Sequence, residues 1–295
     1  MNTGGASTTA PGAASAASTG ARARLAALAA LALGLVWGCG EASTSSLATP
    51  GAAPPAAPPA VLRYTYRIVD KRPLVANSFV QGLQIVGDTL YLGTGQYGAS
   101  RLREYAFPGM RLRREVALPD NLFGEGVTRL GERIYQLTWR SGQVRVYAAA
   151  SLELIRTARI DTEGWGITHD GRRLYYSDGS STLRVLDAHS LAVQRAFSVT
   201  LRGRALPRLN ELEWIDGEIW ANVWQTEQVV RIDPARGQVR GIVDLRGLLP
   251  AAQRRPETGV LNGIAWDEKR RALWVTGKNW PWLYRIRLIA LPGGS

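Results

Sequence analysis

Five segments past residue 60 repeat one order of apolar and polar positions. Each begins with a short apolar strand and a turn with Gly or Asp, followed by an aromatic-rich second strand, a third strand with Arg, and a fourth strand. The turns include Val86-Gly87-Asp88, Asp170-Gly171-Arg172 and Ile215-Asp216-Gly217, which carry the residue types that hairpins need. A helical period appears only in a short stretch near Leu248–Gln253. The pattern therefore predicts an all-β protein.

The spacing of the repeats predicts how they are arranged. Their opening motifs are separated by 44, 40, 45 and 52 residues. A period of about 40–45 residues with four short strands in each repeat is typical of a propeller blade. The motifs are Gln81-Gly82-Leu83-Gln84, Glu125-Gly126-Val127-Thr128, Trp165-Gly166-Ile167-Thr168, Asn210-Glu211-Leu212-Glu213 and Asn262-Gly263-Ile264-Ala265. The sequence predicts a five-bladed β-propeller.

The last repeat is one strand short, because it ends after its third strand at Tyr284–Ile289. The stretch Leu62–Val69, before the first repeat, alternates like an edge strand. We expect this N-terminal strand to supply the missing fourth strand and to close the ring, which would remove exposed sheet edges.

Residues 1–39 are expected to be a signal peptide. Arg22 and Arg24 precede the apolar run Leu25–Val36, which is too short to span about 30 Å of hydrocarbon as a helix. A basic segment before a short apolar core is typical of a secretory signal. The only cysteine, Cys39, lies in a context that resembles a lipoprotein cleavage site, so we expect its lipidation. An ordinary cleaved signal with an incidental cysteine, and a buried N-terminal helix, remain the alternatives.

Residues 40–60 are rich in Ala, Pro, Ser, Thr and Gly, a composition that buries little apolar surface and predicts an extended tether. The propeller domain is therefore expected over residues 61–295. These features predict secretion across the inner membrane of a bacterium, to the periplasm or to a membrane-anchored lipoprotein. A closed propeller with a plain surface is expected to be a monomer that contacts the membrane only through its lipid anchor.

The net charge of +12 raises the question of nucleic-acid binding. The basic residues are mostly arginines that are scattered singly and in pairs along strands, with no basic helix and no RNA-binding signature. We therefore expect no nucleic-acid partner. A basic surface suits an envelope with anionic lipid or polymer nearby.

Equivalent positions of successive blades form rings around the axis of a propeller. The first positions of the repeats are Gln81, Glu125, Trp165, Asn210 and Asn262. A second ring, at the ends of the second strands, contains Gly95, Trp139, Gly179, Trp224 and Lys278. The chain has only three lysines beside 33 arginines, so a lysine in this ring is unlike a generic surface charge. A carboxylate, amides and an amine that converge among aromatic side chains predict a site, with the glycines leaving room for it.

Each of these residues also has a structural interpretation. The tryptophans would pack one blade against the next, Glu125 would be solvated or pair with an arginine, and the asparagines would cap turns. The two histidines lie in turn-like contexts, so a nucleophilic triad is not predicted, and His169 is expected at the surface. A single cysteine excludes a disulfide and a Cys-based zinc site.

Seven motifs together point to a known family. They are Phe79-Val80-Gln81-Gly82-Leu83, Phe123-Gly124-Glu125-Gly126, Gln136-Leu137-Thr138-Trp139, Glu163-Gly164-Trp165-Gly166, Leu209-Asn210-Glu211-Leu212-Glu213-Trp214, Asn222-Val223-Trp224-Gln225 and Val275-Thr276-Gly277-Lys278. They resemble the motifs of the plant and bacterial glutaminyl-peptide cyclotransferases, over about Phe79 to Trp282. This resemblance also implies a five-bladed propeller.

The resemblance implies an enzyme that closes the N-terminal glutamine of peptides and proteins into pyroglutamate and releases ammonia. The catalytic residues that it implies are Glu125, Lys278 and Asn210. The substrate-binding residues that it implies are Phe79, Gln81, Phe123, Trp139, Trp165 and Trp224. It also implies catalysis without a metal or other cofactor. A structural calcium is associated with some members of the family, and no motif of this chain assigns its ligands.

Two other functions remain open at this point. The first is a lipid-tethered propeller that binds peptides or proteins without catalysis, because fold alone does not decide function. The second is a lactonase-like hydrolase, which would need a calcium cluster of acidic and amide residues on the axis. Only one first-position residue, Glu125, is acidic.

Overall fold

The structure is a computed structural model that describes residues 60–75 and 77–292. The predicted signal peptide, Cys39 and nearly all of the predicted tether lie outside these residues. Within them the only helix is the short 3₁₀ helix η1 (Ala251–Gln253), which falls in the stretch where the sequence shows a helical period. No helix in the described ranges is long and apolar enough to cross a membrane. The fold is all-β, as predicted.

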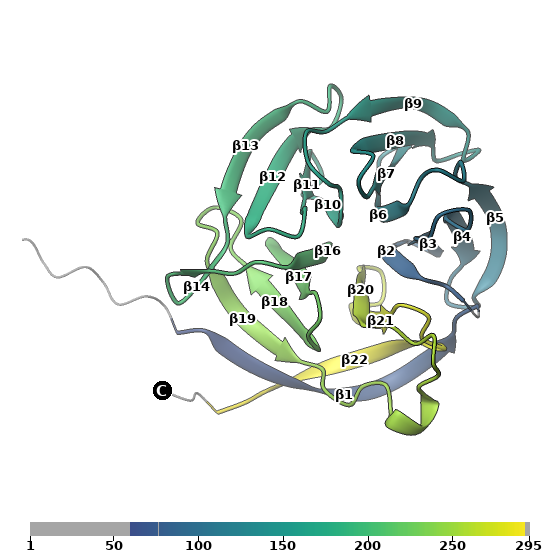
Figure 1. The fold of residues 1–295 in the computed structure, drawn as a ribbon. Coiled ribbons are helices and arrows are strands. Elements are labelled where there is room, and N and C mark those ends of the chain that lie inside the picture. Colours follow the sequence, from purple (N-terminus) through teal and green to yellow (C-terminus); the bar gives the residue numbers. More distant parts are fainter. Residues whose placement is uncertain (1–59, 76, 293–295) are drawn as a thin grey trace, which may run out of the picture. The chain divides into compact units, whose positions relative to one another are not determined.

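Three four-stranded antiparallel sheets follow one another along the chain, each in sequence order (Figure 1). The first is β2 (Val80–Val86), β3 (Thr89–Thr94), β4 (Arg101–Ala106) and β5 (Arg111–Ala117). The second is β6 (Gly124–Leu130), β7 (Arg133–Thr138), β8 (Gln143–Ala148) and β9 (Leu154–Arg159). The third is β10 (Ile167–His169), β11 (Arg173–Tyr176), β12 (Thr182–Asp187) and β13 (Val193–Ser198). A small hairpin follows, β14 (Thr200–Leu201) with β15 (Arg204–Ala205).

The remaining strands form one eight-stranded sheet in the order β16-β17-β18-β19-β1-β22-β21-β20. Its strands are β1 (Leu62–Pro73), β16 (Leu209–Ile215), β17 (Glu218–Val223), β18 (Gln228–Ile232), β19 (Val239–Asp244), β20 (Leu261–Asp267), β21 (Ala272–Gly277) and β22 (Trp282–Ala290). Strand β1 pairs in parallel with β19, from Leu62 opposite Gly241, and antiparallel with β22, up to Pro73 opposite Trp282. The N-terminal strand therefore extends beyond the predicted Leu62–Val69.

The sheets are arranged around a common centre in a β-propeller-like fold (Figure 1). The first strand of each repeat lies nearest this centre, and β2, β6, β10, β16 and β20 contact one another in turn. The fourth strands β5, β9 and β13 lie on the outside. Buried apolar side chains fill the space between neighbouring sheets, for example Tyr91, Val127, Ile134 and Tyr147.

Glycines allow the inner strands to approach closely at the centre. A Cβ atom on Gly126 would lie 2.6 Å from the carbonyl oxygen of Trp165, and one on Gly166 would lie 2.1 Å from that of Asn210. Any larger residue would push the neighbouring strands apart. The glycine at the second position of these opening motifs therefore brings the residues at the first positions together.

Candidate active site

A cavity of about 170 Å³ opens at the end of the propeller-like fold where the inner strands begin. Nine side chains line it: Phe79, Gln81, Phe123, Glu125, Trp139, Trp165, Asn210, Trp224 and Lys278. These are the nine residues that the resemblance implied, so the structure brings every one of them into one place. We call this cavity the aromatic cavity.

The regular topology explains why these positions meet. Gln81, Glu125 and Asn210 lie at the beginnings of β2, β6 and β16. Trp139 and Lys278 directly follow β7 and β21, the second strands of their repeats. The first and second strands of each repeat run antiparallel, so the beginning of the first strand and the end of the second strand lie at the same end of the sheet.

Polar groups form the floor of the aromatic cavity, and aromatic rings form its walls. Gln81, Glu125, Asn210 and Lys278 are only 3%, 4%, 2% and 7% exposed, whereas the five aromatic residues are half-buried. A substrate that enters between the rings would therefore reach polar groups that are largely removed from water.

The aromatic rings contact one another edge to face. The ring centre of Phe123 lies 5.4 Å from that of Trp139, and the centres of Trp165 and Trp224 lie 5.5 Å apart. The glycines of the second ring make this arrangement fit. A Cβ atom on Gly95 would lie 2.3 Å from Phe123, and one on Gly179 would lie 2.7 Å from Trp165. These tryptophans line the cavity in addition to packing the sheets.

A chain of hydrogen bonds fixes the carboxylate on the floor. The Nε2 atom of Gln81 donates to Oε1 of Glu125 at 2.9 Å. The Oε1 atom of Gln81 accepts from Nδ2 of Asn262 at 3.2 Å, and Asn262 also donates to the carbonyl of Val80 at 3.0 Å. Asn262 therefore orients the side chain of Gln81 through a hydrogen bond, although Asn262 itself does not line the cavity.

Burial raises the pKa of Glu125 well above its ordinary value. The positive charge of Lys278 opposes this shift, and the negative charge of Glu163 adds to it. Burial also lowers the pKa of Lys278, and the charge of Glu125 opposes that. Among the described residues the side chain of Lys278 forms no ion pair and no hydrogen bond, and its Nζ atom lies 4.9 Å from the ring centre of Phe79. Two titratable groups with opposed charges are thus held in a poorly solvated cavity.

Asn210 contributes an unused acceptor. Its Oδ1 atom is buried and accepts no hydrogen bond from the described residues. Leaving a buried polar atom unpaired costs about 1–3 kcal/mol, so such atoms are usually paired by a ligand or water. A bound molecule with an N–H group would satisfy this atom.

Glu163 contacts two walls of the aromatic cavity and was not among the predicted site residues. The indole N–H groups of Trp139 and Trp165 both donate to its Oε2 atom, at 2.8 and 2.9 Å. The guanidinium of Arg140 lies 4.1 Å from the ring centre of Trp139, and its Nε atom lies 3.9 Å from Oε1 of Glu163. One carboxylate therefore sets the orientation of two walls. The motif Glu163-Gly164-Trp165 contains both partners of one contact, but the contact to Trp139 depends on the neighbouring sheet.

The expectation for His169 was wrong. Its ring is half-buried, and Nε2 lies 3.1 Å from the side-chain nitrogen of Gln84. Burial lowers the pKa of His169. The side chain contacts Gln84 of β2 because β10 and β2 are both inner strands that lie near the common centre (Figure 1).

The described ranges contain no group of three or more His, Cys, Asp or Glu side chains that could hold a metal ion. The calcium cluster that a lactonase-like propeller would need is therefore not formed by side chains of these types in residues 60–75 and 77–292.

The family model for glutamine cyclotransferase matches residues 41–288 of the chain. The chain belongs to the glutamine cyclotransferase family. A glutaminyl-peptide cyclotransferase from Arabidopsis thaliana is 39% identical over 227 residues, which cover 75% of this chain and 70% of that protein. The family resemblance inferred from the seven motifs is thus confirmed.

A solved structure supports the same assignment. The crystal structure of Myxococcus xanthus glutaminyl cyclase is similar at 33% sequence identity with a TM-score of 0.72. The similarity covers 79% of this chain and all of that chain. The glutamine cyclotransferase family thus accounts for nearly the whole part of the chain that the structure describes.

Proposed function

We propose that the chain is a glutaminyl-peptide cyclotransferase, which converts the N-terminal glutamine of peptides and proteins into pyroglutamate and ammonia. The observation that carries this proposal is the convergence of a buried carboxylate, amine and amide under a wall of five aromatic rings. Membership in the glutamine cyclotransferase family supports it.

The reaction is an intramolecular acyl transfer. The α-amine attacks the γ-carbonyl carbon of the same residue, a new carbon–nitrogen bond closes a five-membered ring, and the bond to the amide nitrogen breaks. The α-amine has a pKa of about 7.7–8.0, so it must lose a proton before it attacks. The amide nitrogen must gain a proton before it leaves as ammonia.

Glu125 is suited to both proton transfers. Its carboxylate takes the proton from the attacking α-amine and returns a proton to the departing nitrogen. A general acid–base group is most effective when its pKa lies near the working pH, and burial shifts the pKa of Glu125 in this direction. The hydrogen bond from Gln81 holds the carboxylate in place.

Lys278 is suited to stabilise the γ-oxygen while it carries negative charge, and Asn210 is suited to hold the amide nitrogen of the substrate. The ammonium group of Lys278 has no competing acid partner within ion-pair distance among the described residues. The side-chain amide of Asn210 has a free acceptor, which can take an N–H of the substrate amide. Phe79, Phe123, Trp139, Trp165 and Trp224 enclose the flat glutamine side chain, exclude water and hold the amine near the carbonyl.

Each of these steps uses only groups of the chain, so we propose that catalysis is independent of metal ions and other cofactors. The test is mass spectrometry of Gln-initiated peptides after incubation with the purified protein, with and without a chelator. An otherwise identical Asn-initiated peptide is the control, because its shorter side chain cannot close the same ring. We expect loss of ammonia from the Gln-peptides alone, unaffected by the chelator. Absence of this loss with folded protein would instead favour a peptide-binding platform.

We also propose that the fold is a five-bladed propeller closed by the N-terminal strand. The eight-stranded sheet would then be two blades, β16–β19 and β20–β22 with β1. The pairing of β1 with β22 along nearly its whole length supports this interpretation. For the residues outside the described ranges, we keep the proposal of a cleaved signal peptide, lipidation at Cys39 and a monomer in the periplasm or on an envelope membrane. The mass of the mature N-terminus tests the lipidation.

A further inference from the structure

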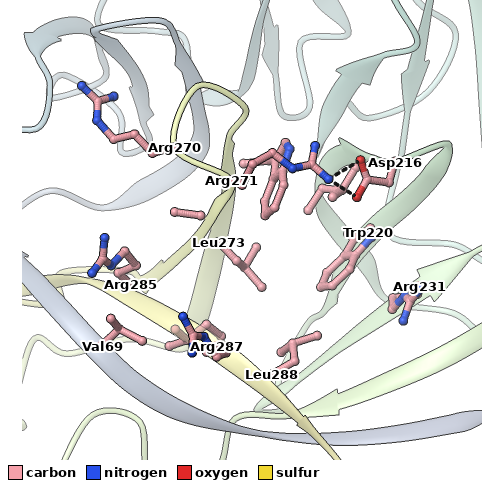
Figure 2. Close-up of a pocket in the computed structure, with 14 residues that line it drawn as sticks. Val69, Asp216, Trp220, Arg231, Arg270, Arg271, Leu273, Arg285, Arg287 and Leu288 are labelled. Carbon is pink, nitrogen blue, oxygen red and sulfur yellow. Dashed lines mark hydrogen bonds and ion pairs between the residues drawn. The ribbon is translucent and has the colours of Figure 1, made fainter.

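A second cavity, of about 430 Å³, is drawn in Figure 2. It lies at the other end of β16 and β21 from the aromatic cavity. Asn210 near the start of β16 lines the aromatic cavity, whereas Ile215 at its end lines this one. At about 3.3 Å per residue the two positions lie roughly 16 Å apart along the strand. We call the second cavity the arginine pocket.

The floor of the arginine pocket is apolar. It is formed by Ile215, Trp220, Leu273, Ile286 and Leu288, which belong to or pack on one hydrophobic cluster. Trp220 is only 6% exposed, and its indole Nε1 is buried without an acceptor among the described residues. The floor thus combines an apolar surface with one unpaired donor.

The rim of the arginine pocket is strongly basic. Five arginines line it, Arg231, Arg270, Arg271, Arg285 and Arg287, and the only acidic lining residue is Asp216. Three of these arginines are neutralised: Arg231 by Glu218 at 2.7 Å, Arg270 by Asp267 at 3.1 Å, and Arg271 by Asp216 at 3.0 Å, the last drawn in Figure 2.

The other two arginines, Arg285 and Arg287 of β22, form no ion pair and no side-chain hydrogen bond with residues 60–75 or 77–292. The Nε atom of Arg285 is buried without an acceptor. Arg285 lies opposite Trp274 and Ile286 lies opposite Leu273, so Arg285 and Arg287 project to one face of β22 and Ile286 and Leu288 to the other. Both sets line the arginine pocket, which therefore lies across the end of the sheet. The guanidinium groups of Arg285 and Arg287 therefore have hydrogen-bond donors available for a ligand.

The strand register places a like-charge pair beside this cavity, and it places Asp70, which forms an ion pair with Arg72, opposite Arg285. Arg287 lies directly opposite Arg67 of β1 in the antiparallel pair, so the two side chains project to the same face. Like charges directly opposite each other destabilise a sheet. Arg67 also has no acid partner among the described residues. An anion bound here would remove the repulsion and pair the free donors.

We propose that the arginine pocket binds an amphiphile with one anionic head group, a carboxylate or a phosphate, and an apolar body. The head lies on Arg285 and Arg287, because planar guanidinium groups bind such oxygens through two parallel hydrogen bonds. The body passes the end of β21 and lies on Trp220, Leu273 and Leu288, on the other face of β22. The volume falls within the range of roughly 300–1,000 Å³ that is usual for small-molecule sites. This site is independent of the proposed cyclotransferase activity.

The test is isothermal titration calorimetry of the purified full chain with decanoate and with decyl phosphate. The R285Q/R287Q variant removes the two free guanidinium groups. The R111Q/R204Q variant is the matched control, since it makes the same charge change at two exposed arginines of other sheets. We expect decanoate and decyl phosphate to bind the native chain and the control alike, and the Kd to rise at least tenfold in R285Q/R287Q. Inorganic phosphate has only the anionic head, and decanol has only the apolar body. Each should bind the native chain at least tenfold more weakly than decanoate and decyl phosphate do.

Circular dichroism and the rate of glutaminyl-peptide cyclisation show whether R285Q/R287Q keeps its fold, and we expect both to be unchanged. Cosedimentation with phosphatidylglycerol vesicles distinguishes the sources of the amphiphile. Cosedimentation that R285Q/R287Q loses assigns the site to a bilayer lipid, and decanoate binding without cosedimentation assigns it to a free amphiphile. Absence of decanoate and decyl phosphate binding to the native chain, or equal binding by a folded R285Q/R287Q variant, would overturn the proposal.

Discussion

The aromatic cavity and the arginine pocket lie at opposite ends of the same strands. Their polar and apolar side chains occupy opposite positions. In the aromatic cavity the polar groups are buried on the floor and the aromatic rings surround the mouth. In the arginine pocket the apolar side chains form the floor and the charged groups surround the mouth. The first arrangement buries a carboxylate and an amine together, and burial shifts the pKa values of both and strengthens the interaction of their charges. The difference suggests that the smaller cavity performs chemistry and the larger one binds.

The largest effect is expected from Glu125→Gln, which removes the proton acceptor and keeps the shape of the side chain. The amide oxygen of the new side chain can still accept the hydrogen bond from Gln81. We expect the rate of ammonia release to fall roughly 10²–10⁴-fold, the usual contribution of a positioned acid–base group. Decanoate binding at the arginine pocket and the thermal unfolding midpoint are the controls, and neither should change. A rate near that of the native protein would remove the chemical distinction between the two cavities.

A somewhat smaller effect is expected from Lys278→Met, which removes the amine and keeps much of the apolar stem. Loss of one group that stabilises an oxyanion typically lowers kcat by about 10²–10³. The charge of Lys278 also lowers the pKa of Glu125, so its removal should raise that pKa further. If Glu125 acts as the base, the acid limb of the kcat/KM profile should move to higher pH. A profile that keeps its position would show that Lys278 does not act on the charge of Glu125.

The smallest effect is expected from changes at Glu163, which contacts the walls and not the floor of the aromatic cavity. Glu163→Ala removes the shared acceptor of Trp139 and Trp165, so we expect KM to rise about tenfold with a smaller change in kcat. Glu163→Gln keeps an oxygen for the two indoles but removes the charge that raises the pKa of Glu125. The acid limb should therefore move to lower pH, opposite to Lys278→Met, while KM stays near its native value.

A matched control for Glu163→Ala is Glu268→Ala. Glu268 also accepts a hydrogen bond from an indole, that of Trp266, but it is exposed and belongs to the β20–β21 turn. Steady-state kinetics with a Gln-initiated peptide should be unchanged in this variant. Equal effects of the two substitutions on KM would mean that Glu163 has no special part in placing the walls.

The predictable part of the site followed from the repeats. Because equivalent positions of a repeated strand unit come together around one axis, spacing alone could bring Glu125, Asn210 and Lys278 to one end. Side-chain contacts between neighbouring sheets could not be predicted in the same way. The contact of Glu163 with Trp139, and that of Asn262 with Gln81, depend on how one sheet is rotated against the next. The repeat period carries no information on that rotation.

The arginine pocket was not predictable from the sequence for a related reason. Its basic edge depends on the register between β1 and β22, which places Arg67 opposite Arg287. A slip of one residue would turn every side chain of one strand to the other face. In the sequence these arginines are two members of a large, scattered set. The N-terminal strand itself was predicted from its alternation, but the pattern did not specify its partners residue by residue.

The pairing of β1 with β22 also has a consequence for the order in which the molecule folds. Arg67 and Arg287 are paired although 220 residues separate them in the chain. During synthesis the first strand of the domain emerges early, and its longest partner strand is the last to be made. Until then β1 has only the short parallel contact with β19 available. Contacts of such long sequence separation form slowly, because the entropy of closing a large loop is lost before the contact stabilises the chain. We therefore expect the joining of the two ends to be the last step of folding.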